Sequence, residues 1–438
     1  MGVFSLRGTF RKRPFFAFLR CFLFFLFYFL HCKIMRKNED ALFYENGAFR
    51  KRGMTMQTGF PEVKKKLGFG AMRLPMIGEK VDLAAFSKMV DLFLSEGFNY
   101  FDTAHPYLNG ESELALREAL TSRYPREAYL LANKLTAPYF DQESDIRPFF
   151  EKQLQWCGVS YFDFYLMHAQ NLGNYDKFQR CHAYETAFAL KKEGKIRHVG
   201  LSFHDKAEVL ERILGDHPDV EFVQIQMNYI DMESTAVDAR RVYETCLRFH
   251  KPVIVMEPVK GGSLVKLPPK AQHLFDTLQQ GAYPKASNAS YAIRFVAGHE
   301  GIFMVLSGMS TLSQVADNTS FMKDFKPLTD KEKRTLDGVV EVFSQLDAVP
   351  CTACRYCIEE NHCPKKIPIP DIFSLLNSMR VFNNHNANFY YENVVTANAG
   401  KASDCILCGA CEHVCPQHLT IRKFLKEAAA TFEEPKKG

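Results

Sequence analysis

The chain has 438 residues, of which 47% are hydrophobic and 24% are charged, a composition typical of globular proteins. This length favours two domains, each large enough to bury a core. The net charge of +5 arises in residues 1–53, which carry 11 Lys and Arg against 3 Asp and Glu, whereas the remainder carries 44 against 47. A slightly acidic body argues against nucleic acid as the main partner.

Residues 1–55 form a basic and hydrophobic extension ahead of the expected fold. Arg20 interrupts its apolar run from Phe15 to Leu30, which leaves a stretch shorter than the ~20 apolar residues of a membrane span. No small-residue cleavage site follows the run, unlike a secretory signal peptide. We interpret the extension as lying outside the fold, for example through a misassigned start, and consider membrane contact unlikely; a membrane anchor and a cleaved signal are the alternatives.

Eight short apolar runs, mostly about 30 residues apart, follow between Lys64 and Phe325. They are predicted strands: Lys66–Met72, Tyr100–Thr103, Tyr129–Ala132, Phe162–Met167, His198–Ser202, Phe222–Asn228, Pro252–Met256 and Ile302–Ser307. Helical patterns lie between them: Leu83–Gly97, Glu111–Ser122, Ile146–Cys157, Tyr175–Gly194 and Met232–His250. Strict alternation predicts parallel strands with helical crossovers.

Eight such units predict an α/β fold, a closed (β/α)8 TIM barrel, over residues 62–326. The alternative is an open doubly wound sheet, which normally carries a glycine-rich phosphate loop after its first strand. Gly68-Phe69-Gly70 is a poor match because no third glycine follows. The closed barrel is therefore the favoured architecture.

Polar residues end three successive predicted strands, where barrel enzymes place their chemistry. Asp102 ends the second strand and Tyr107 follows in the loop, whereas Lys134 and His168 end the third and fourth. Taken singly, each has a plain structural alternative: a capping Asp, a surface Tyr, a solvated Lys or a core His. Together they predict one catalytic constellation at the barrel mouth.

The order and spacing of these four residues resemble the catalytic tetrad of the aldo-keto reductases, and the resemblance covers about 260 residues. It implies an NAD(P)H-dependent oxidoreductase that reduces a small-molecule carbonyl substrate, with Tyr107 as general acid and His168 orienting the carbonyl. A free tyrosine titrates near pH ~10. We expect Lys134, held by Asp102, to lower that pKa.

The same resemblance implies contacts to a bound NADP or NAD. Its cofactor-binding positions are Ser202, Gln224, Met256, Gly308, Ser310, Gln314 and Asn318. Ser202 and Gln224 would contact the carboxamide, and Met256 stands where the family usually stacks an aromatic ring. Gly308 and Gln314 stand where many members carry Lys and Arg for the 2′-phosphate of NADP. Helix capping is the alternative role for Ser310 and Asn318.

Eight of the 13 cysteines lie between Cys351 and Cys415, in two groups. The groups are Cys351, Cys354, Cys357 and Cys363, and then Cys405, Cys408, Cys411 and Cys415. The second group matches the ferredoxin spacing C-x2-C-x2-C-x3-C-P, and the first has two extra residues before its last cysteine. We expect a small, mainly helical ferredoxin-type domain over residues 328–438 with two 4Fe-4S clusters.

In such pairs of motifs the fourth cysteine usually ligates the other cluster. One expected set is therefore Cys351, Cys354, Cys357 and Cys415, and the other is Cys405, Cys408, Cys411 and Cys363. A zinc site is the alternative, since zinc also uses C-x2-C pairs. Clustered thiols in a long enzyme indicate metal ligands in a reducing compartment, so the expected location is cytoplasmic.

Three functions remain open from the sequence. The first is a carbonyl reductase whose clusters are structural. The second is an electron-transfer protein whose clusters exchange electrons with ferredoxin or another redox partner; here a hydride carries two electrons whereas each cluster takes one. The third is a nicotinamide-binding redox sensor, which the tetrad argues against because a sensor needs no proton donor.

Overall fold

The computed structural model describes residues 43–45, 48–50, 59–234, 237–281, 284–359, 362–382 and 387–433. The hairpin of β1 (Phe43–Glu45) and β2 (Ala48–Arg50) belongs to a separate unit, Met1–Met56. The rest of the expected N-terminal extension lies outside the described residues, so its interpretation stays a prediction. Within the described part of the chain, no helix is both long and apolar enough to cross a membrane.

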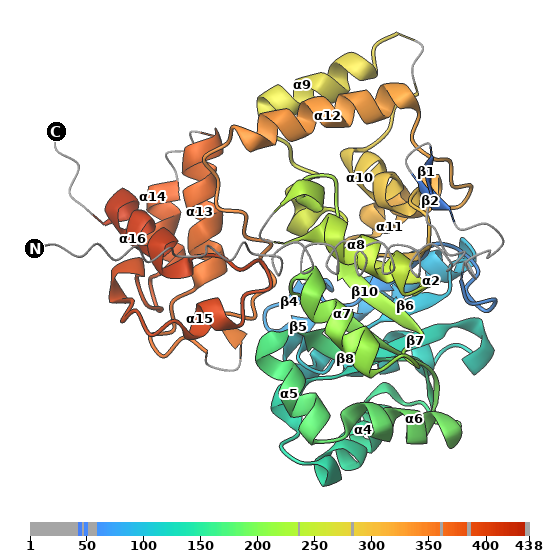
Figure 1. The fold of residues 1–438 in the computed structure, drawn as a ribbon. Coiled ribbons are helices and arrows are strands. Elements are labelled where there is room, and N and C mark those ends of the chain that lie inside the picture. The colour runs from blue at the N-terminus through green and yellow to red at the C-terminus, as the bar shows by residue number, and fades with distance from the viewer. Residues whose placement is uncertain are drawn as a thin grey trace, which may run out of the picture. The chain divides into compact units, whose positions relative to one another are not determined.

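Eight parallel strands close into a barrel in the order β10-β11-β12-β3-β6-β7-β8-β9 (Figure 1). The strands are β3 (Leu67–Gly70), β6 (Tyr100–Asp102), β7 (Leu130–Leu135), β8 (Phe162–Gln170), β9 (Ile196–Phe203), β10 (Phe222–Gln226), β11 (Val253–Met256) and β12 (Ile302–Ser307). A short antiparallel pair, β4 (Met76–Ile77) and β5 (Lys80–Val81), follows β3. The predicted (β/α)8 barrel is confirmed, and the open doubly wound sheet is wrong.

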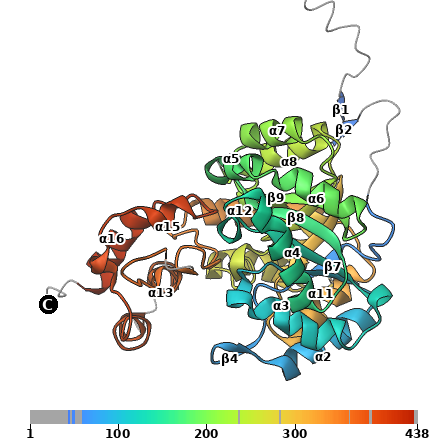
Figure 2. The same ribbon diagram turned by 90° about the horizontal axis from the view of Figure 1, so that it is seen from below.

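Helices follow the strands around the barrel (Figure 2). They are α2 (Leu83–Ser95), α3 (Glu111–Leu116), α4 (Glu143–Cys157), α5 (Leu172–Arg180), α6 (Ala183–Lys192), α7 (Ala207–Asp216), α8 (Ala239–Arg248), α9 (Pro269–Leu278), α10 (Asn288–Ala297) and α11 (Leu312–Met322). The prediction of one helix over Tyr175–Gly194 is wrong. The chain breaks at His182, whose φ of 49° is left-handed, and the break lets Tyr175 and Tyr184 on separate helices both be buried.

Large aromatic side chains fill the barrel interior. Phe60 closes one end, with its ring centroid 5.2 Å from that of Phe164, 5.8 Å from Phe222 and 4.9 Å from Phe303. Gly200 of β9 makes room for this packing, since a Cβ there would lie 2.4 Å from the Phe222 ring. The interior is therefore a filled core, and open space is found at the mouth.

The C-terminal segment is mainly helical, as predicted. Its helices are α12 (Asp330–Ser344), α13 (Ile369–Phe382), α14 (Ala387–Tyr390), α15 (Ala410–His413) and α16 (Ile421–Phe432). Leu336 and Val339 of α12 share a hydrophobic cluster with Phe275 of α9, on the barrel side. A second core joins α13 and α16. The boundary expected between residues 326 and 328 remains a prediction.

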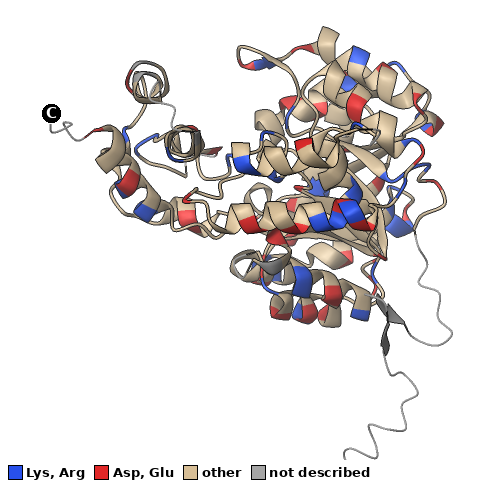
Figure 3. Cartoon of the chain, turned by 90° about the horizontal axis from the view of Figure 1, so that it is seen from above, with Lys and Arg blue, Asp and Glu red and all other residues tan. Residues whose placement is uncertain are grey.

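Acidic and basic side chains are mixed along the surface helices (Figure 3). Many of them form ion pairs across neighbouring helices. Arg147 Nη2 lies 2.6 Å from Glu193 Oε1, and Arg248 Nη2 lies 2.7 Å from Glu211 Oε1. Exposed pairs of this kind contribute little to stability. On the described helices they place opposite charges side by side. The expectation that nucleic acid is not a partner stays a prediction.

We expect Gly200→Ala to lower the free energy of unfolding by about 1–3 kcal/mol, because the added methyl overpacks the barrel interior against Phe222. Urea unfolding followed by circular dichroism measures the change. The control is Gly215→Ala in α7, where an added Cβ meets nothing within 4 Å and alanine favours the helix. Equal urea midpoints for Gly200→Ala and Gly215→Ala would contradict the conclusion that Gly200 makes room for the packing of Phe222.

Candidate active site and cluster-binding segment

Asp102 and Lys134 form a buried ion pair between adjacent strands. Asp102 ends β6, which pairs in register with β7, so that Asp102 lies opposite Ala132. Lys134 Nζ donates to Asp102 Oδ1 over 2.6 Å and to the carbonyl oxygen of Thr103 over 2.8 Å. Burial raises the pKa of Asp102, although the Lys134 charge opposes the shift, and burial lowers the pKa of Lys134. Each charge in this core is compensated by the other.

Tyr107 begins a short turn after β6 and is buried. Lys134 Nζ lies 4.8 Å from the centroid of its ring. Burial raises the pKa of Tyr107 well above 10, and the neighbouring Tyr356 and Asp102 raise it further, whereas Arg73 lowers it. The net shift is therefore opposite to the lowered Tyr107 pKa that the sequence predicts, because burial of the phenol is the largest cause.

His168 of β8 completes the constellation. Its ring lies edge-on to that of Tyr107, with centroids 5.9 Å apart. The Nδ1 atom is 2.7 Å from the Thr136 hydroxyl. Burial lowers the pKa of His168 well below 6.5, helped by the charges of Lys134 and His204, so the imidazole is neutral at pH 7. If the Thr136 hydroxyl donates to Nδ1, the Nε2 atom carries the proton and faces the mouth as a donor.

A fifth side chain reaches this site from the cysteine segment, and the sequence did not reveal it. Tyr356 lies between Cys354 and Cys357, and its hydroxyl oxygen is 3.4 Å from His168 Nε2. Tyr356 and Tyr107 line the same cavity. A tyrosine within a metal-ligand motif carries no pattern that assigns it to a distant barrel, so only the folded chain brings it to notice.

A cavity of about 1170 Å³ opens at the mouth, between the barrel and the cysteine segment. Of the predicted catalytic residues, Asp102, Tyr107 and His168 line it, whereas Lys134 lies behind them. The seven predicted cofactor residues also line it: Ser202, Gln224, Met256, Gly308, Ser310, Gln314 and Asn318. From the C-terminal side it is lined by Thr352, Tyr356 and Gln417, among others. The structure thus brings every predicted catalytic and cofactor residue except Lys134 to the wall of one cavity.

Two strand residues that line the mouth, Ser202 and Gln224, have hydrogen-bonding groups without a partner in the described chain. Gln224 Oε1 is buried and has no partner among the described residues, while its Nε2 donates only to the sulfur of Met256, over 3.4 Å. Ser202 Oγ accepts from the Ala169 amide over 2.8 Å, which leaves its hydroxyl hydrogen to donate. One unpaired acceptor and one free donor fit a primary carboxamide such as that of nicotinamide.

The residues after β12 are engaged in local structure as well. Gln314 Oε1 accepts from the amides of Ser310 and Thr311, over 2.7 and 3.2 Å, as part of the capping box that begins α11. Asn318 Oδ1 accepts from the Ser307 hydroxyl over 2.7 Å. These bonds organise the loop, and the same side chains face the cavity.

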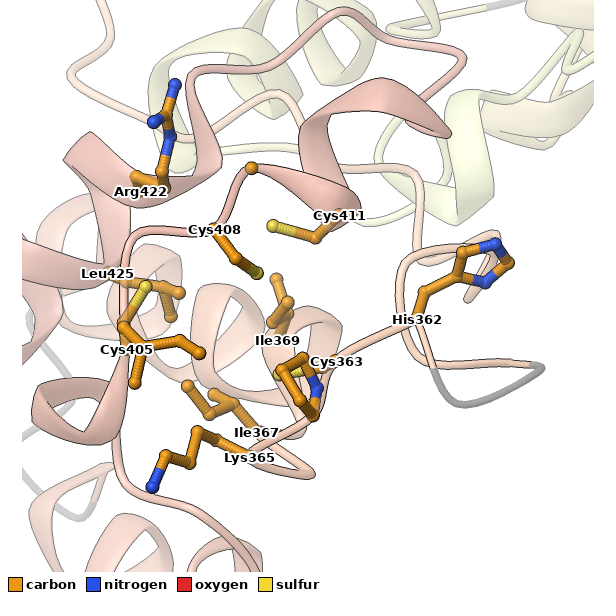
Figure 4. Close-up of a pocket in the computed structure, with 13 residues that line it drawn as sticks. His362, Cys363, Lys365, Ile367, Ile369, Cys405, Cys408, Cys411, Arg422 and Leu425 are labelled. Carbon is orange, nitrogen blue, oxygen red and sulfur yellow. The ribbon is translucent and has the colours of Figure 1, made fainter.

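The eight clustered cysteines line two small cavities in crossed sets. Cys363 lines one cavity with Cys405, Cys408 and Cys411 (Figure 4). Cys415 lines the other with Cys351, Cys354 and Cys357. The last cysteine of each motif is therefore exchanged, in the grouping that the ferredoxin spacing predicts.

The cavity walls fit an iron–sulfur cluster better than a single zinc ion. Ile367, Ile369 and Leu425 line the first cavity, and Phe373 and Leu419 line the second. Four thiols around a shared apolar space are the arrangement that a 4Fe-4S cluster needs. Within the described ranges, no three His, Cys, Asp or Glu side chains gather closely enough to hold one metal ion.

Two polar contacts attach the cysteine segment to the barrel mouth. Arg73 donates to the carbonyl oxygen of Thr352 over 2.9 Å and pairs with Glu257 at 3.1 Å. The side-chain amides of Gln226 and Gln417 donate to each other, over 2.9 and 2.7 Å, and both are buried. The mouth and the first cysteine motif are thereby held together at two points.

Comparison with known proteins now identifies the fold. The aldo/keto reductase family model matches residues 66–341. The chain belongs to the aldo/keto reductase family. A model described as a 4Fe-4S dicluster domain matches residues 350–420. This aldo/keto reductase is therefore an oxidoreductase fused to a ferredoxin-type segment, which confirms the family resemblance found in the sequence.

Solved aldo-keto reductases share its barrel. The reductase AKR11C1 of Bacillus halodurans, in its holo form, has a TM-score of 0.52 at 22% identity, over 63% of this chain and 92% of that one. A Klebsiella pneumoniae enzyme in complex with NADPH has a TM-score of 0.50 at 19% identity, over 64% and 95%. At these identities the likeness shows the fold.

Curated relatives match parts of the chain. The uncharacterized oxidoreductase C215.11c of Schizosaccharomyces pombe is 26% identical over 267 residues, which are 58% of this chain and 81% of the relative. Norsolorinic acid reductase B of Dothistroma septosporum is 39% identical over 79 residues, or 18% of this chain and 20% of that protein. The second match is thus confined to a fifth of its relative.

Removing one partner of the buried pair in this aldo/keto reductase should be costly. We expect Lys134→Met to lower the free energy of unfolding by roughly 3–5 kcal/mol, since Asp102 is left buried without its counter-charge. The double variant Asp102→Asn/Lys134→Met is the matched control and should recover much of the loss. Urea unfolding compares the wild type, Lys134→Met and the double variant. A double variant less stable than Lys134→Met would contradict the conclusion that each buried charge compensates the other.

Proposed function

We propose that the enzyme reduces a small-molecule carbonyl compound with NAD(P)H at the barrel mouth. The proposal is carried by one observation: Tyr107, His168 and Asp102 line the same cavity as Gln224, whose side-chain oxygen has no partner in the described chain. Lys134 lies behind them and is bound to Asp102. Two structural relatives from Klebsiella pneumoniae are described with NADPH, and with NADP and acetate, which supports a nicotinamide cofactor.

The nicotinamide, when bound, supplies hydride to the carbonyl carbon. Tyr107 donates its phenolic proton to the carbonyl oxygen, and neutral His168 donates a hydrogen bond from Nε2 to the same oxygen. Once Tyr107 has lost its proton, the Lys134 charge beside its ring stabilises the phenolate. Asp102 keeps that ammonium in place. Ser202 and Gln224 would hold the carboxamide, and Met256 would lie against the ring.

The proposal extends to the remaining cofactor positions and to the domains. The adenine end of NADP or NAD would lie against Gly308, Ser310, Gln314 and Asn318. Residues 62–326 would form the reductase barrel and residues 328–438 the ferredoxin-type domain. Clustered free thiols favour a reducing, cytoplasmic location.

The two crossed thiol sets would each hold one 4Fe-4S cluster, and a bound cluster supplies one-electron transfer. The inner set, which flanks Tyr356, consists of Cys351, Cys354, Cys357 and Cys415. The outer set consists of Cys363, Cys405, Cys408 and Cys411. In the outer set Cys408 is exposed, beside the exposed Ile406 and Leu407. The protein's part is to supply these thiolates and the apolar walls around them.

A second candidate function is electron exchange between the clusters and ferredoxin or another redox partner. The contact of Tyr356 with His168 favours it, because this side chain links the inner thiol set to the reductase site. The visible absorbance of anaerobic protein before and after NADPH separates the two functions. Bleaching would support electron transfer to the clusters, and unchanged absorbance at full iron content would leave them structural or fed by another donor.

Loss of the proton donor tests the reductase. We expect Tyr107→Phe to lower kcat by about 10²–10⁴-fold with small aldehydes, since general acid catalysis contributes a factor of this size. Steady-state NADPH oxidation measures it. Tyr229→Phe is the control, because that buried hydroxyl has no hydrogen-bond partner in the described chain. A Tyr107→Phe enzyme with kcat near that of the wild type would rule out this role.

Loss of ligands tests the clusters. We expect the double variant Cys408→Ser/Cys411→Ser to lose about half of the bound iron, because one of two four-cysteine sites is removed. Iron per chain is counted after anaerobic reconstitution. Cys246→Ala, a buried barrel cysteine outside both sets, is the control. Unchanged iron in the double variant would contradict the ligand assignment.

A further inference from the structure

The Tyr356 hydroxyl lies in the mouth beside the two groups that act on the substrate in the proposed reaction. Tyr107, His168 and Tyr356 line the same cavity, and the Tyr356 oxygen is 3.4 Å from His168 Nε2. When Nε2 carries the imidazole proton, it donates that hydrogen to the Tyr356 oxygen.

A substrate carbonyl oxygen needs the same hydrogen-bond donor. It must accept the Tyr107 proton, and it must accept a hydrogen bond from His168 Nε2 for orientation. Nε2 has at most one hydrogen to donate. The oxygen of Tyr356 and that of a substrate therefore exclude each other at His168.

We propose that Tyr356, which the iron–sulfur segment supplies to the barrel, is an internal competitor for the carbonyl-oxygen site. The inference rests on the proposed reductase function. A substrate reacts only after displacing this hydroxyl, so its apparent affinity is its intrinsic affinity multiplied by the fraction of molecules in which the site is open. That fraction is the same for every carbonyl substrate, and contacts elsewhere in the cavity of about 1170 Å³ add to the affinity of larger ones.

The surrounding backbone holds the phenol in position. Tyr356 is separated from Cys354 by one residue and is followed directly by Cys357, and both cysteines line the inner cavity. Nearby, Thr352 lies so close to Gly261 that a Cβ at that glycine would be 2.2 Å from the Thr352 oxygen. The hydroxyl is therefore presented by an anchored segment, and a cluster bound to the flanking thiolates would strengthen the anchoring.

The first test separates binding from chemistry. Tyr356→Phe removes the competing oxygen and keeps the ring. With NADPH and 4-nitrobenzaldehyde, we expect KM to fall about tenfold while kcat changes less than twofold, because a hydrogen bond of ordinary strength is lost only from the state in which Tyr356 occupies the site. The ratio of the kcat/KM values of a bulkier aryl ketone and 4-nitrobenzaldehyde should stay the same, because the fraction of open sites affects both substrates alike. Tyr229→Phe should leave both constants unchanged.

Iron per chain is counted in every variant, so that a lost cluster is not mistaken for a lost competitor. Tyr356→Ala serves as the second variant and should lower KM at least as far, since the ring no longer stands in the mouth. An unchanged KM in both variants at full iron content would overturn the proposal. A fall of tenfold or more in kcat would overturn it as well, because Tyr356 would then take part in the chemistry.

A binding experiment tests the competition without turnover. Acetate, whose oxygens accept hydrogen bonds as a carbonyl does, is titrated calorimetrically into protein with NADP. We expect Tyr356→Phe to bind acetate about tenfold more tightly than the wild type does. Tighter acetate binding in a protein that reduces no aldehyde would support the competition and refute the reductase function. Equal acetate affinity in a protein whose activity depends on Tyr107 would refute the competition alone.

Discussion

The ion pair of Lys134 and Asp102 is the constraint on which the site depends. Burying these charges is expensive unless geometry and hydrogen bonds are complete. The barrel meets this demand with a polar layer beside the pair: the Lys134 amide donates to Asn133 Oδ1 over 2.8 Å, and the Asn133 side chain donates to Glu113 over 2.8 Å. Gln153 donates to the carbonyl oxygen of Lys134 over 3.1 Å. Adjacent strands, a crossover helix and the loop carrying Tyr107 are thereby fixed around one ammonium group.

From this fixed base the reaction space is built by two parts of the chain. The barrel supplies the proton donor, the imidazole and the amide-binding residues, and the cysteine segment supplies the facing wall through Thr352, Tyr356 and Gln417. The paired amides of Gln226 and Gln417 are buried at this junction. Access to the mouth is consequently a property of the fused chain rather than of the barrel alone.

Much of this could be predicted from the sequence, because strand–helix alternation and short-range spacing are local signals. The eight strands, the tetrad positions and the crossed cysteine sets are of this kind. The break at His182 escaped prediction because the apolar pattern continues across it. Tyr356 escaped because its role depends on a contact 188 residues away in sequence. The direction of the Tyr107 pKa shift was not predicted, because burial, which only the fold determines, outweighs a neighbouring charge.

The two thiol sets differ in their shielding, and this difference bears on handling the enzyme in air. Cys357 and Cys415 of the inner set are buried, whereas Cys408 of the outer set is exposed on a loop with Ile406 and Leu407. Oxidation of cysteine follows exposure, so Cys408 is the thiol of the two sets most open to dissolved oxygen. If each set holds a cluster, as proposed, aerobic purification would remove the outer cluster first and leave the inner site and the Tyr356 contact in place.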